Sequence, residues 1–197
     1  MADPASLSTL RTLYNRAARS FLNRDNSQTY GLLDSAFALL HPPYTFQDDD
    51  QLAEQRKKWD ILRITLETTI RSSSSGGGKI MLEPTNTLVN SWYTRSLELF
   101  TPQSQNGKSA VQRDVSCLPT AVLTTLMYSS IKLDCASMGR DMAEDWLAKR
   151  FPSRNDGYSK IIELFCLQIL PKLREWEYAE EFLTFEHELL LETREVS

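Results

Sequence analysis

Apolar side chains recur every three or four residues along most of this chain, the spacing that places them on one face of an α-helix. The first such stripe covers residues 10–22 and the second covers residues 32–40. Asp25 and Gln28 precede the second stripe at the spacing of a capping box, in which side chains bond the free N–H groups of a helix start. His41 and two prolines end the second helix, because proline has no N–H to continue the ladder.

A third stripe covers residues 59–70 and follows three aspartates at 48–50, whose charges suit the N-terminal turn of a helix. The segment 71–79 (RSSSSGGGK) has the composition of a linker, either a natural loop or an engineered replacement. A fourth helix should start at Pro84 and include Leu88 and Trp92. The polar segment 101–116 shows no periodicity, so we expect loops near 71–83 and 101–116.

The apolar pattern is strongest in the C-terminal half. It covers residues 122–131 after Pro119, which suits a first helical turn, and then residues 135–147 and 158–170. The 158–170 segment is apolar around most of its girth, which predicts a central buried helix that Pro171 kinks or ends. A last helix over 176–189 should carry an outer face rich in glutamate.

These stripes predict an all-α fold of about eight helices and no strand. Short turns within pairs and longer loops between pairs favour antiparallel hairpins, stacked as in TPR-like arrays or other α-solenoids. We expect one domain over residues 1–197. A clean 34-residue repeat is missing from the sequence, so a generic helical bundle is the alternative. Four tryptophans lie on the apolar stripes and should anchor the packing: Trp59, Trp92, Trp146 and Trp176.

Composition excludes several classes of protein. Of 197 residues, 41% are hydrophobic and 24% charged, as in ordinary globular proteins, and the 7 glycines and 8 prolines are too few for collagen-like or turn-rich all-β chains. A formal net charge of −4 gives no overall positive field, so we expect no nucleic-acid partner. No segment reaches the roughly 18 apolar residues that span a bilayer, so we expect no membrane contact by this segment itself. A native chain that continues past Ser197 into a membrane anchor is compatible with that expectation.

Charge is distributed unevenly between the two ends. Residues 1–24 contain four arginines and one acid, whereas residues 175–197 contain eight glutamates and one arginine. One interpretation is two ordinary solvated helix faces. The other is an acidic C-terminal surface that docks a basic partner, with Glu180 and Glu181 as the candidate partner-binding residues.

The sequence contains little material for catalysis. Cys117, Cys135 and Cys166 form no CxxC pair, so a small buried side chain is the expected role of each. His41 is interpreted as a helix cap, and His187 has no metal-ligating residue three or four positions away. The segment 75–80 (SGGGKI) lacks both the first glycine and the final hydroxyl of a phosphate-binding loop. We therefore expect no catalytic, cofactor-binding or metal-binding residue, and a protein that is not an enzyme.

The C-terminal half nevertheless shows a pattern of short motifs in a fixed order: Leu118-Pro119-x-x-Val122-Leu123, Met127-Tyr128-Ser129, Glu144-Asp145-Trp146-Leu147, Tyr158, Leu170-Pro171 and Ala179-Glu180-Glu181. Over roughly residues 117–185, this pattern resembles the cytosolic domain of the tail-anchored peroxisomal peroxins, the family of peroxin twenty-six and fungal peroxin fifteen. The N-terminal half fits the family only in forming a helix hairpin.

The resemblance implies a helical receptor domain on the cytosolic face of the peroxisomal membrane, held there by a C-terminal helix. In that family the domain recruits the AAA ATPase subunits that recycle the import receptor during matrix protein import. The ATPase-binding residues of the family match no motif in this chain, so none is carried over. Two alternatives remain: a cytosolic α-solenoid scaffold of another targeting or traffic pathway, and a small helical enzyme or ligand-binding protein.

Overall fold

A computed structural model describes residues 4–43, 50–73, 83–102, 113–149 and 157–186. Within these ranges every regular element is helical and no strand occurs, which confirms the all-α prediction. Since α8, η2 and α9 follow one another without a break, the described residues form eight helical rods and one short 3-10 turn, η1. Their bounds are α1 (Pro4–Leu22), α2 (Asn26–Phe37), α3 (Ala53–Ser72), α5 (Thr85–Phe100), η1 (Val115–Cys117), α6 (Thr120–Lys132), α7 (Ala136–Lys149), α8 (Tyr158–Leu164), η2 (Phe165–Ile169), α9 (Leu170–Lys172) and α10 (Trp176–Phe185).

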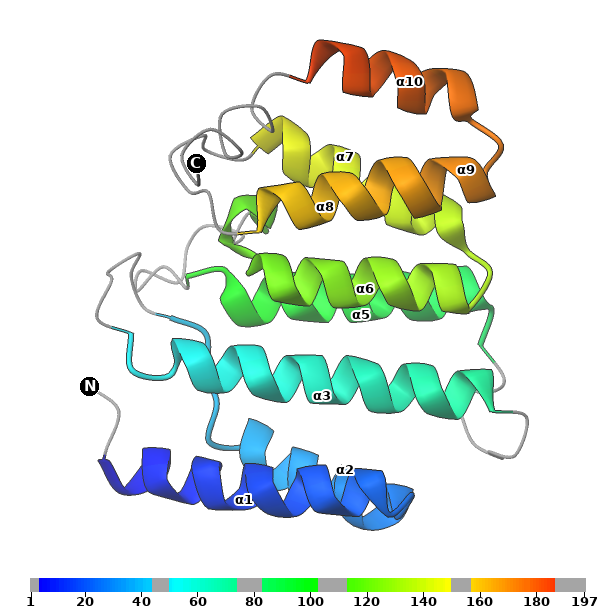
Figure 1. Cartoon of the computed structure of the whole chain (residues 1–197). Coiled ribbons are helices and arrows are strands. Elements are labelled where there is room, and N and C mark those ends of the chain that lie inside the picture. Colours follow the sequence, from blue (N-terminus) through cyan, green and yellow to red (C-terminus); the bar gives the residue numbers. More distant parts are fainter. Residues whose placement is uncertain (1–3, 44–49, 74–82, 103–112, 150–156, 187–197) are drawn as a thin grey trace, which may run out of the picture.

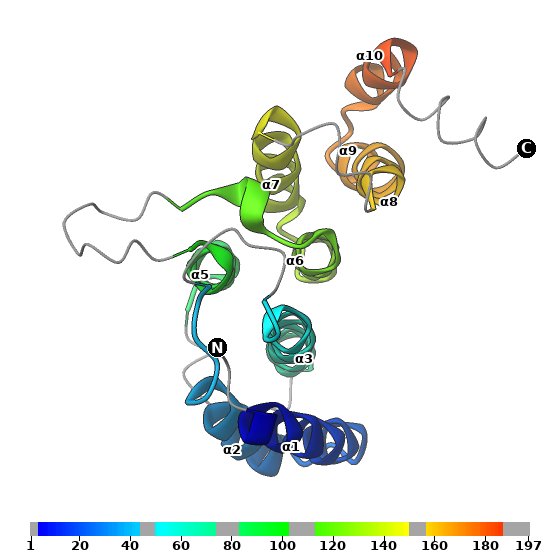
Figure 2. The same ribbon diagram turned by 90° about the vertical axis from the view of Figure 1, so that its left-hand side faces the viewer.

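The helices stack in antiparallel pairs. Figure 1 shows α1, α3, α6 and α8 running in one direction, with α2, α5, α7 and α10 returning in the other. Seen from the side in Figure 2, α3, α6 and α8 form one row, beside which α5 and α7 lie. The pair α1–α2 closes one end of the stack and α10 lies at the opposite end. The arrangement of hairpins is as expected, whereas its assignment to the TPR-like arrays stays a prediction.

Three of the hairpins turn by the same backbone device. Each first helix is followed by two residues of which the second has a positive φ, and the next helix starts two positions later. Around each turn, two N–H groups donate to carbonyls three and five positions earlier, which is the Schellman motif. The residues with positive φ are Arg24 (60°), Asp134 (61°) and Arg174 (64°).

Glycine is the usual residue at this position of the motif, because a side chain in the left-handed region costs about 1–2 kcal/mol. We expect Arg24→Gly to raise the free energy of unfolding by up to about 1 kcal/mol, since relief of that strain exceeds glycine's entropic cost of about 0.5–1 kcal/mol. Arg16→Gly, at an exposed position inside α1, should instead lower it by about 1 kcal/mol. Urea denaturation measures both, and equal losses in the two variants would contradict the strain at Arg24.

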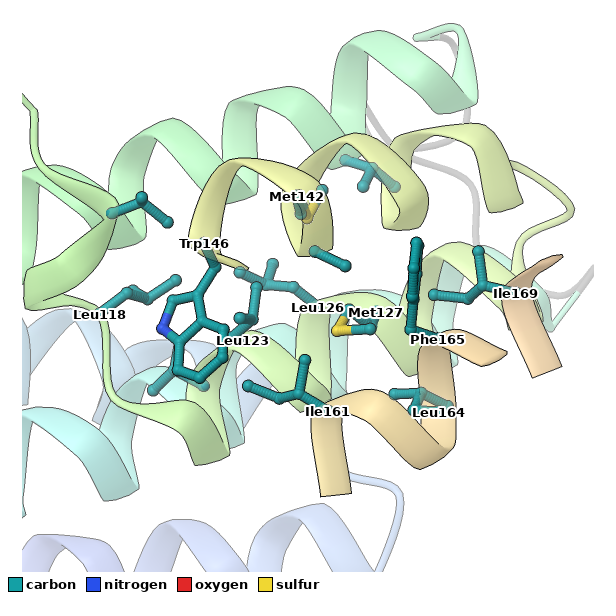
Figure 3. Packing of buried hydrophobic residues seen from close by; sticks show 14 of the residues in the cluster. Leu118, Leu123, Leu126, Met127, Met142, Trp146, Ile161, Leu164, Phe165 and Ile169 are labelled. Carbon is teal, nitrogen blue, oxygen red and sulfur yellow. The ribbon is translucent and has the colours of Figure 1, made fainter. Parts of the chain in front are cut away.

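Helix α6 occupies the centre of the larger of two hydrophobic cores (Figure 3). It contacts α3, α5, α7 and α8, and buries Val122, Leu123, Leu126 and Met127. Gly139 allows α7 to approach α6 closely, because a Cβ there would clash with the hydroxyl of Ser130. The prediction that the 158–170 helix takes the central place is therefore wrong.

That helix buries one broad face and leaves another in solvent, where Lys160, Glu163 and Leu167 are exposed. Its second half widens into the π-helical segment η2, in which the Leu170 N–H donates to the Phe165 carbonyl. Pro171 has no N–H and so cannot bond the carbonyl four positions earlier. The end expected at Pro171 thus takes the form of a widened turn, after which the helix ends at Lys172.

Local predictions in the first half are confirmed in part. Helix α2 ends at Phe37, so the expectation that His41 and the two prolines end it is wrong. Asp25 caps α2, with its side chain accepting from the Gln28 N–H at 2.9 Å, but the Gln28 side chain bonds the Ser20 hydroxyl instead of completing the box. Helix α5 begins directly after Pro84, as expected. The predicted linker starts at residue 71, but helix α3 continues to Ser72. The segment 101–116 is predicted to be a loop, but its last two residues belong to the 3-10 turn η1. No helix in the described ranges is long and apolar enough to cross a membrane.

Three of the four tryptophans anchor the core as predicted. Trp59, Trp92 and Trp146 are at most 5% exposed, and the Trp146 ring stacks on Tyr158 at 6.4 Å between centroids. Trp176 is 58% exposed, so the prediction that it is a core anchor is wrong. It begins α10 at the end of the stack, where no further helix covers it in the described residues.

A stripe of four charged residues, three of them buried and Arg63 partly buried, runs along α3 between its two apolar sides: Arg56, Asp60, Arg63 and Glu67. One apolar side, with Trp59, belongs to the smaller core formed with α1 and α2, whereas the other, with Ile64, belongs to the larger core. The charges therefore lie at the boundary of the two cores.

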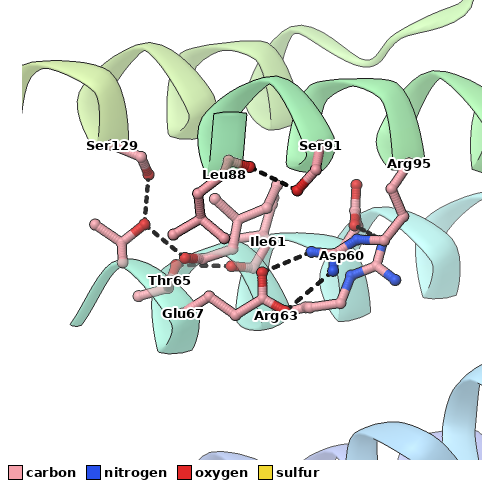
Figure 4. A network of polar contacts seen from close by, with 11 residues as sticks. Asp60, Ile61, Arg63, Thr65, Glu67, Leu88, Ser91, Arg95 and Ser129 are labelled. Carbon is pink, nitrogen blue, oxygen red and sulfur yellow. Dashed lines mark hydrogen bonds and ion pairs between the residues drawn. The ribbon is translucent and has the colours of Figure 1, made fainter. Parts of the chain in front are cut away.

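Each charge in the stripe has a partner: Arg56 pairs with Asp50, and Figure 4 shows the contacts of Asp60, Arg63 and Glu67. Asp60 is fully buried and pairs with Arg63, whose guanidinium also lies 4.0 Å from the centre of the Phe37 ring on α2. Glu67 accepts two hydrogen bonds from Arg95 on α5, at 2.7 and 3.1 Å. Burial lowers the pKa of Arg63 and, together with the nearby Glu67 charge, raises the pKa of Tyr30 to about 12.

Removing one member of a buried pair leaves an uncompensated charge. We expect Asp60→Ala to lower the free energy of unfolding by about 3–5 kcal/mol, because it strands the Arg63 guanidinium. The double variant Asp60→Leu with Arg63→Met should recover most of that loss, since apolar replacement of a buried pair is often neutral. Guanidinium denaturation of the three proteins measures both changes. A double variant less stable than Asp60→Ala would contradict this account.

Candidate protein-docking surface

Helix α10 is attached to the stack through its inner side. Phe165 of η2 is fully buried and meets two rings of α10 edge-on, Tyr178 at 6.2 Å and Phe182 at 5.6 Å between centroids. Ala179, between them, is 6% exposed and is the buried residue of this helix. These contacts fix which side of α10 faces the core and which faces solvent.

Polar contacts hold the start of α10 against α7. Glu175, just before the helix, pairs with Arg140 of α7 at 2.6 Å. Burial, followed by the negative charge of its hydrogen-bond partner Glu144, raises the pKa of Tyr178. The hydrogen bond from Arg140 to Glu175 is the main reason that the pKa of Arg140 is raised. Glu175 precedes α10 and Tyr178 lies on the inner side of α10, so these contacts with α7 leave the outer side of α10 uncovered.

The outer side of α10 combines exposed apolar and acidic side chains. Trp176 is 58% exposed, Leu183 42% and Phe185 71%, values that are high for large apolar residues. Between them along the helix lie three exposed glutamates, none of which forms an ion pair with another described residue: Glu177, Glu180 and Glu181. Phe185, nine residues after Trp176, lies on the opposite flank of the helix. We refer to Trp176, Leu183 and the three glutamates as the α10 outer face.

The sequence prediction of Glu180 and Glu181 as partner-binding residues is compatible with this geometry, since both are exposed on one helix. Their role in binding stays a prediction. The apolar members of the face were not predicted as surface residues, because Trp176 and Leu183 fit the same helical periodicity as core residues. A signal for them was present in the sequence, since Trp176, Glu180 and Leu183 are spaced four and three residues apart and share one side of a helix.

A second candidate is an open depression of about 410 Å³ between α3, α6 and the start of α8. Among the described residues, its titratable lining groups are Tyr128 and Lys160, and no described carboxylate, histidine or cysteine lines it. Such a lining holds no acid–base pair of the kind that hydrolases use. The other lining residues are Ile61, Thr120, Ala121, Thr124, Thr125 and Gly157.

The structure also places the cysteines and one of the two histidines that the sequence singled out. All three cysteines are free thiols, with Cys135 and Cys166 buried and Cys117 half-buried in η1. Burial raises the pKa of Cys135 and raises that of Cys166 to about 11, which makes both poor nucleophiles.

The Nδ1 atom of His41 lies 3.0 Å from the Pro42 carbonyl oxygen. His187 and the glycines at 76–78 lie outside the described residues. Across the described ranges, no three His, Cys, Asp or Glu side chains gather where they could hold a metal ion.

Comparisons with known proteins add no relative. No protein-family model matches the chain, and neither a curated protein nor a solved structure matches it.

If the inner aromatic contacts hold α10 in place, Phe182→Ala should loosen this helix without unfolding the rest. We expect amide hydrogen exchange to speed up in residues 176–185 and to stay unchanged in α6, because each helix relies on different core contacts. Phe185→Ala is the matched control, since Phe185 is 71% exposed. Equal effects of the two variants, measured by mass spectrometry, would contradict this attachment.

Proposed function

We propose that this chain is a non-enzymatic protein-interaction adaptor and that the α10 outer face is its docking surface. The observation that carries the proposal is the exposure of Trp176 beside glutamates that have no counter-charge among the described residues. Exposed apolar side chains rimmed by charge are typical of protein-binding sites, and tryptophan is among the residues that contribute most binding energy.

The charges of this face specify the kind of partner. Three glutamates without a counter-charge in the described part of the chain favour a basic segment, which they attract during encounter and hold in register. An arginine of that segment can pair with Glu180 while a neighbouring arginine stacks on the Trp176 ring. A basic amphipathic helix satisfies both requirements, because its apolar residues can cover Leu183, which lies on the same side of α10 as Trp176 and Glu180.

The resemblance to the tail-anchored peroxins supports a more specific proposal. It covers roughly residues 117–185, a range that contains α6 to α10 and so includes Glu180 and Glu181. On this proposal the chain lies on the cytosolic face of the peroxisomal membrane, anchored by a following C-terminal helix. There it recruits AAA ATPase subunits for recycling of the import receptor.

Affinity capture with purified components tests this function. The chain, extended by its native C-terminus, is immobilised and exposed to the AAA ATPase subunits of the same organism. We expect retention that weakens at high salt, and at least a tenfold loss of affinity in Glu180→Lys with Glu181→Lys, because both attractive charges become repulsive. Glu163→Lys is the matched control, since Glu163 is equally exposed but lies on α8.

Each outcome decides between the alternatives. Unchanged binding by the Glu180 and Glu181 variant would place the interface elsewhere and contradict the docking surface. Failure to retain any ATPase subunit would overturn the peroxisomal proposal. Recovery of components of another targeting or traffic pathway in co-purification would then favour the cytosolic scaffold.

A further inference from the structure

The two ends of the helix stack carry opposite charge. The end formed by α1 and α2 has four arginines and two aspartates over residues 4–43, whereas residues 172–186 at the other end have five glutamates and two basic residues. Helices α1 and α10 are the outermost helices at these ends (Figure 1). A second copy of the chain can therefore bring its α1 against α10 of the first with attraction between unlike charges.

The outer side of α1 is free for such a contact. Arg11, Arg16 and Arg19 are exposed on α1, Arg24 is exposed in the following turn, and none of the four forms an ion pair with another described residue. Leu22 is 78% exposed and lies on the same side of α1 as Arg11 and Arg19. The inner side of this helix, with Leu10 and Ala17, is occupied by the smaller core.

The α10 outer face and the outer side of α1 also carry complementary side chains. The α10 outer face presents three glutamates between apolar residues, and the outer side of α1 presents three arginines and one leucine. Arginine suits this contact, because its guanidinium binds carboxylates in a bidentate manner and also stacks on tryptophan. The 10 residues of α10 span about 15 Å and the 19 residues of α1 about 28 Å, so α10 can cover the half of α1 that contains Arg16, Arg19 and Leu22.

We propose that copies of this chain associate head to tail, with the α10 outer face of one copy on the arginine side of α1 of the next. The contact joins two different surfaces, so each added copy leaves one free surface of each kind, and the association is open-ended. One ten-residue helix makes a small interface, and small interfaces are weak and reversible. Since a partner on α10 would occupy the same face, this association and partner docking exclude each other, although neither depends on the other.

A charge exchange between copies tests the proposal. Sedimentation velocity of the full chain should show an average mass that rises with protein concentration at about 20 mM salt and falls to the monomer at about 500 mM, where screening is strong. The acidic variant Arg16→Glu with Arg19→Glu should be monomeric under both conditions, and so should the basic variant Glu180→Lys with Glu181→Lys. Mixing the two variants should restore association, because each then meets the opposite charge on the other.

Two controls separate this contact from general charge effects. Lys58→Glu and Glu163→Lys change exposed charges on α3 and α8 and should leave association as in the unchanged chain. Circular dichroism confirms that each variant is folded. A chain that is monomeric at every concentration, a single variant that still associates, or a mixture that stays monomeric would each overturn the proposal, whatever the chain does with an ATPase.

Discussion

The reversal of the chain between paired helices is the constraint on which the rest of the structure depends. Arg24, Asp134 and Arg174 occupy the same left-handed position of the same turn, so the chain reverses direction by the same backbone geometry in three hairpins. Antiparallel neighbours can then bury their apolar stripes against each other, and the next hairpin covers what remains. The repeat in this protein is therefore a repeat of backbone geometry, which side-chain identities do not reveal.

Much of the fold could be predicted from the sequence, because helical periodicity and helix boundaries are local properties. The cap at Asp25, the start of α5 after Pro84 and the all-α class were all read from spacing alone. The central place of α6 could not be read in this way. The 158–170 helix has more apolar positions around its circumference, but α6 is the helix that contacts four neighbours. Tertiary contacts decide which helix is central, and periodicity contains no information about them.

Periodicity also fails to predict whether a given side chain is exposed or buried, as one tryptophan and two charged residues show. Trp176 fits a core stripe, yet it is exposed because no helix follows α10 in the described stack. Asp60 and Arg63 look like surface residues, yet Asp60 is buried and Arg63 partly buried because two cores meet along α3. The spacing of alternating charges at 56, 60, 63 and 67 did place them on one side of a helix, which is a usable signal once apolar sides flank it.

The boundary between the two cores has a consequence for how the protein opens. The hairpin α1–α2 shares its apolar contacts with one side of α3, while the larger core continues without it. The hairpin is held on α3 by the smaller core and by the Arg63 guanidinium over the Phe37 ring, whereas the ion pair of Glu67 with Arg95 joins α3 to α5 and stays intact when the hairpin leaves. The N-terminal hairpin is thus a cooperative unit of its own, able to detach at a lower free energy than global unfolding and to refold on an intact remainder.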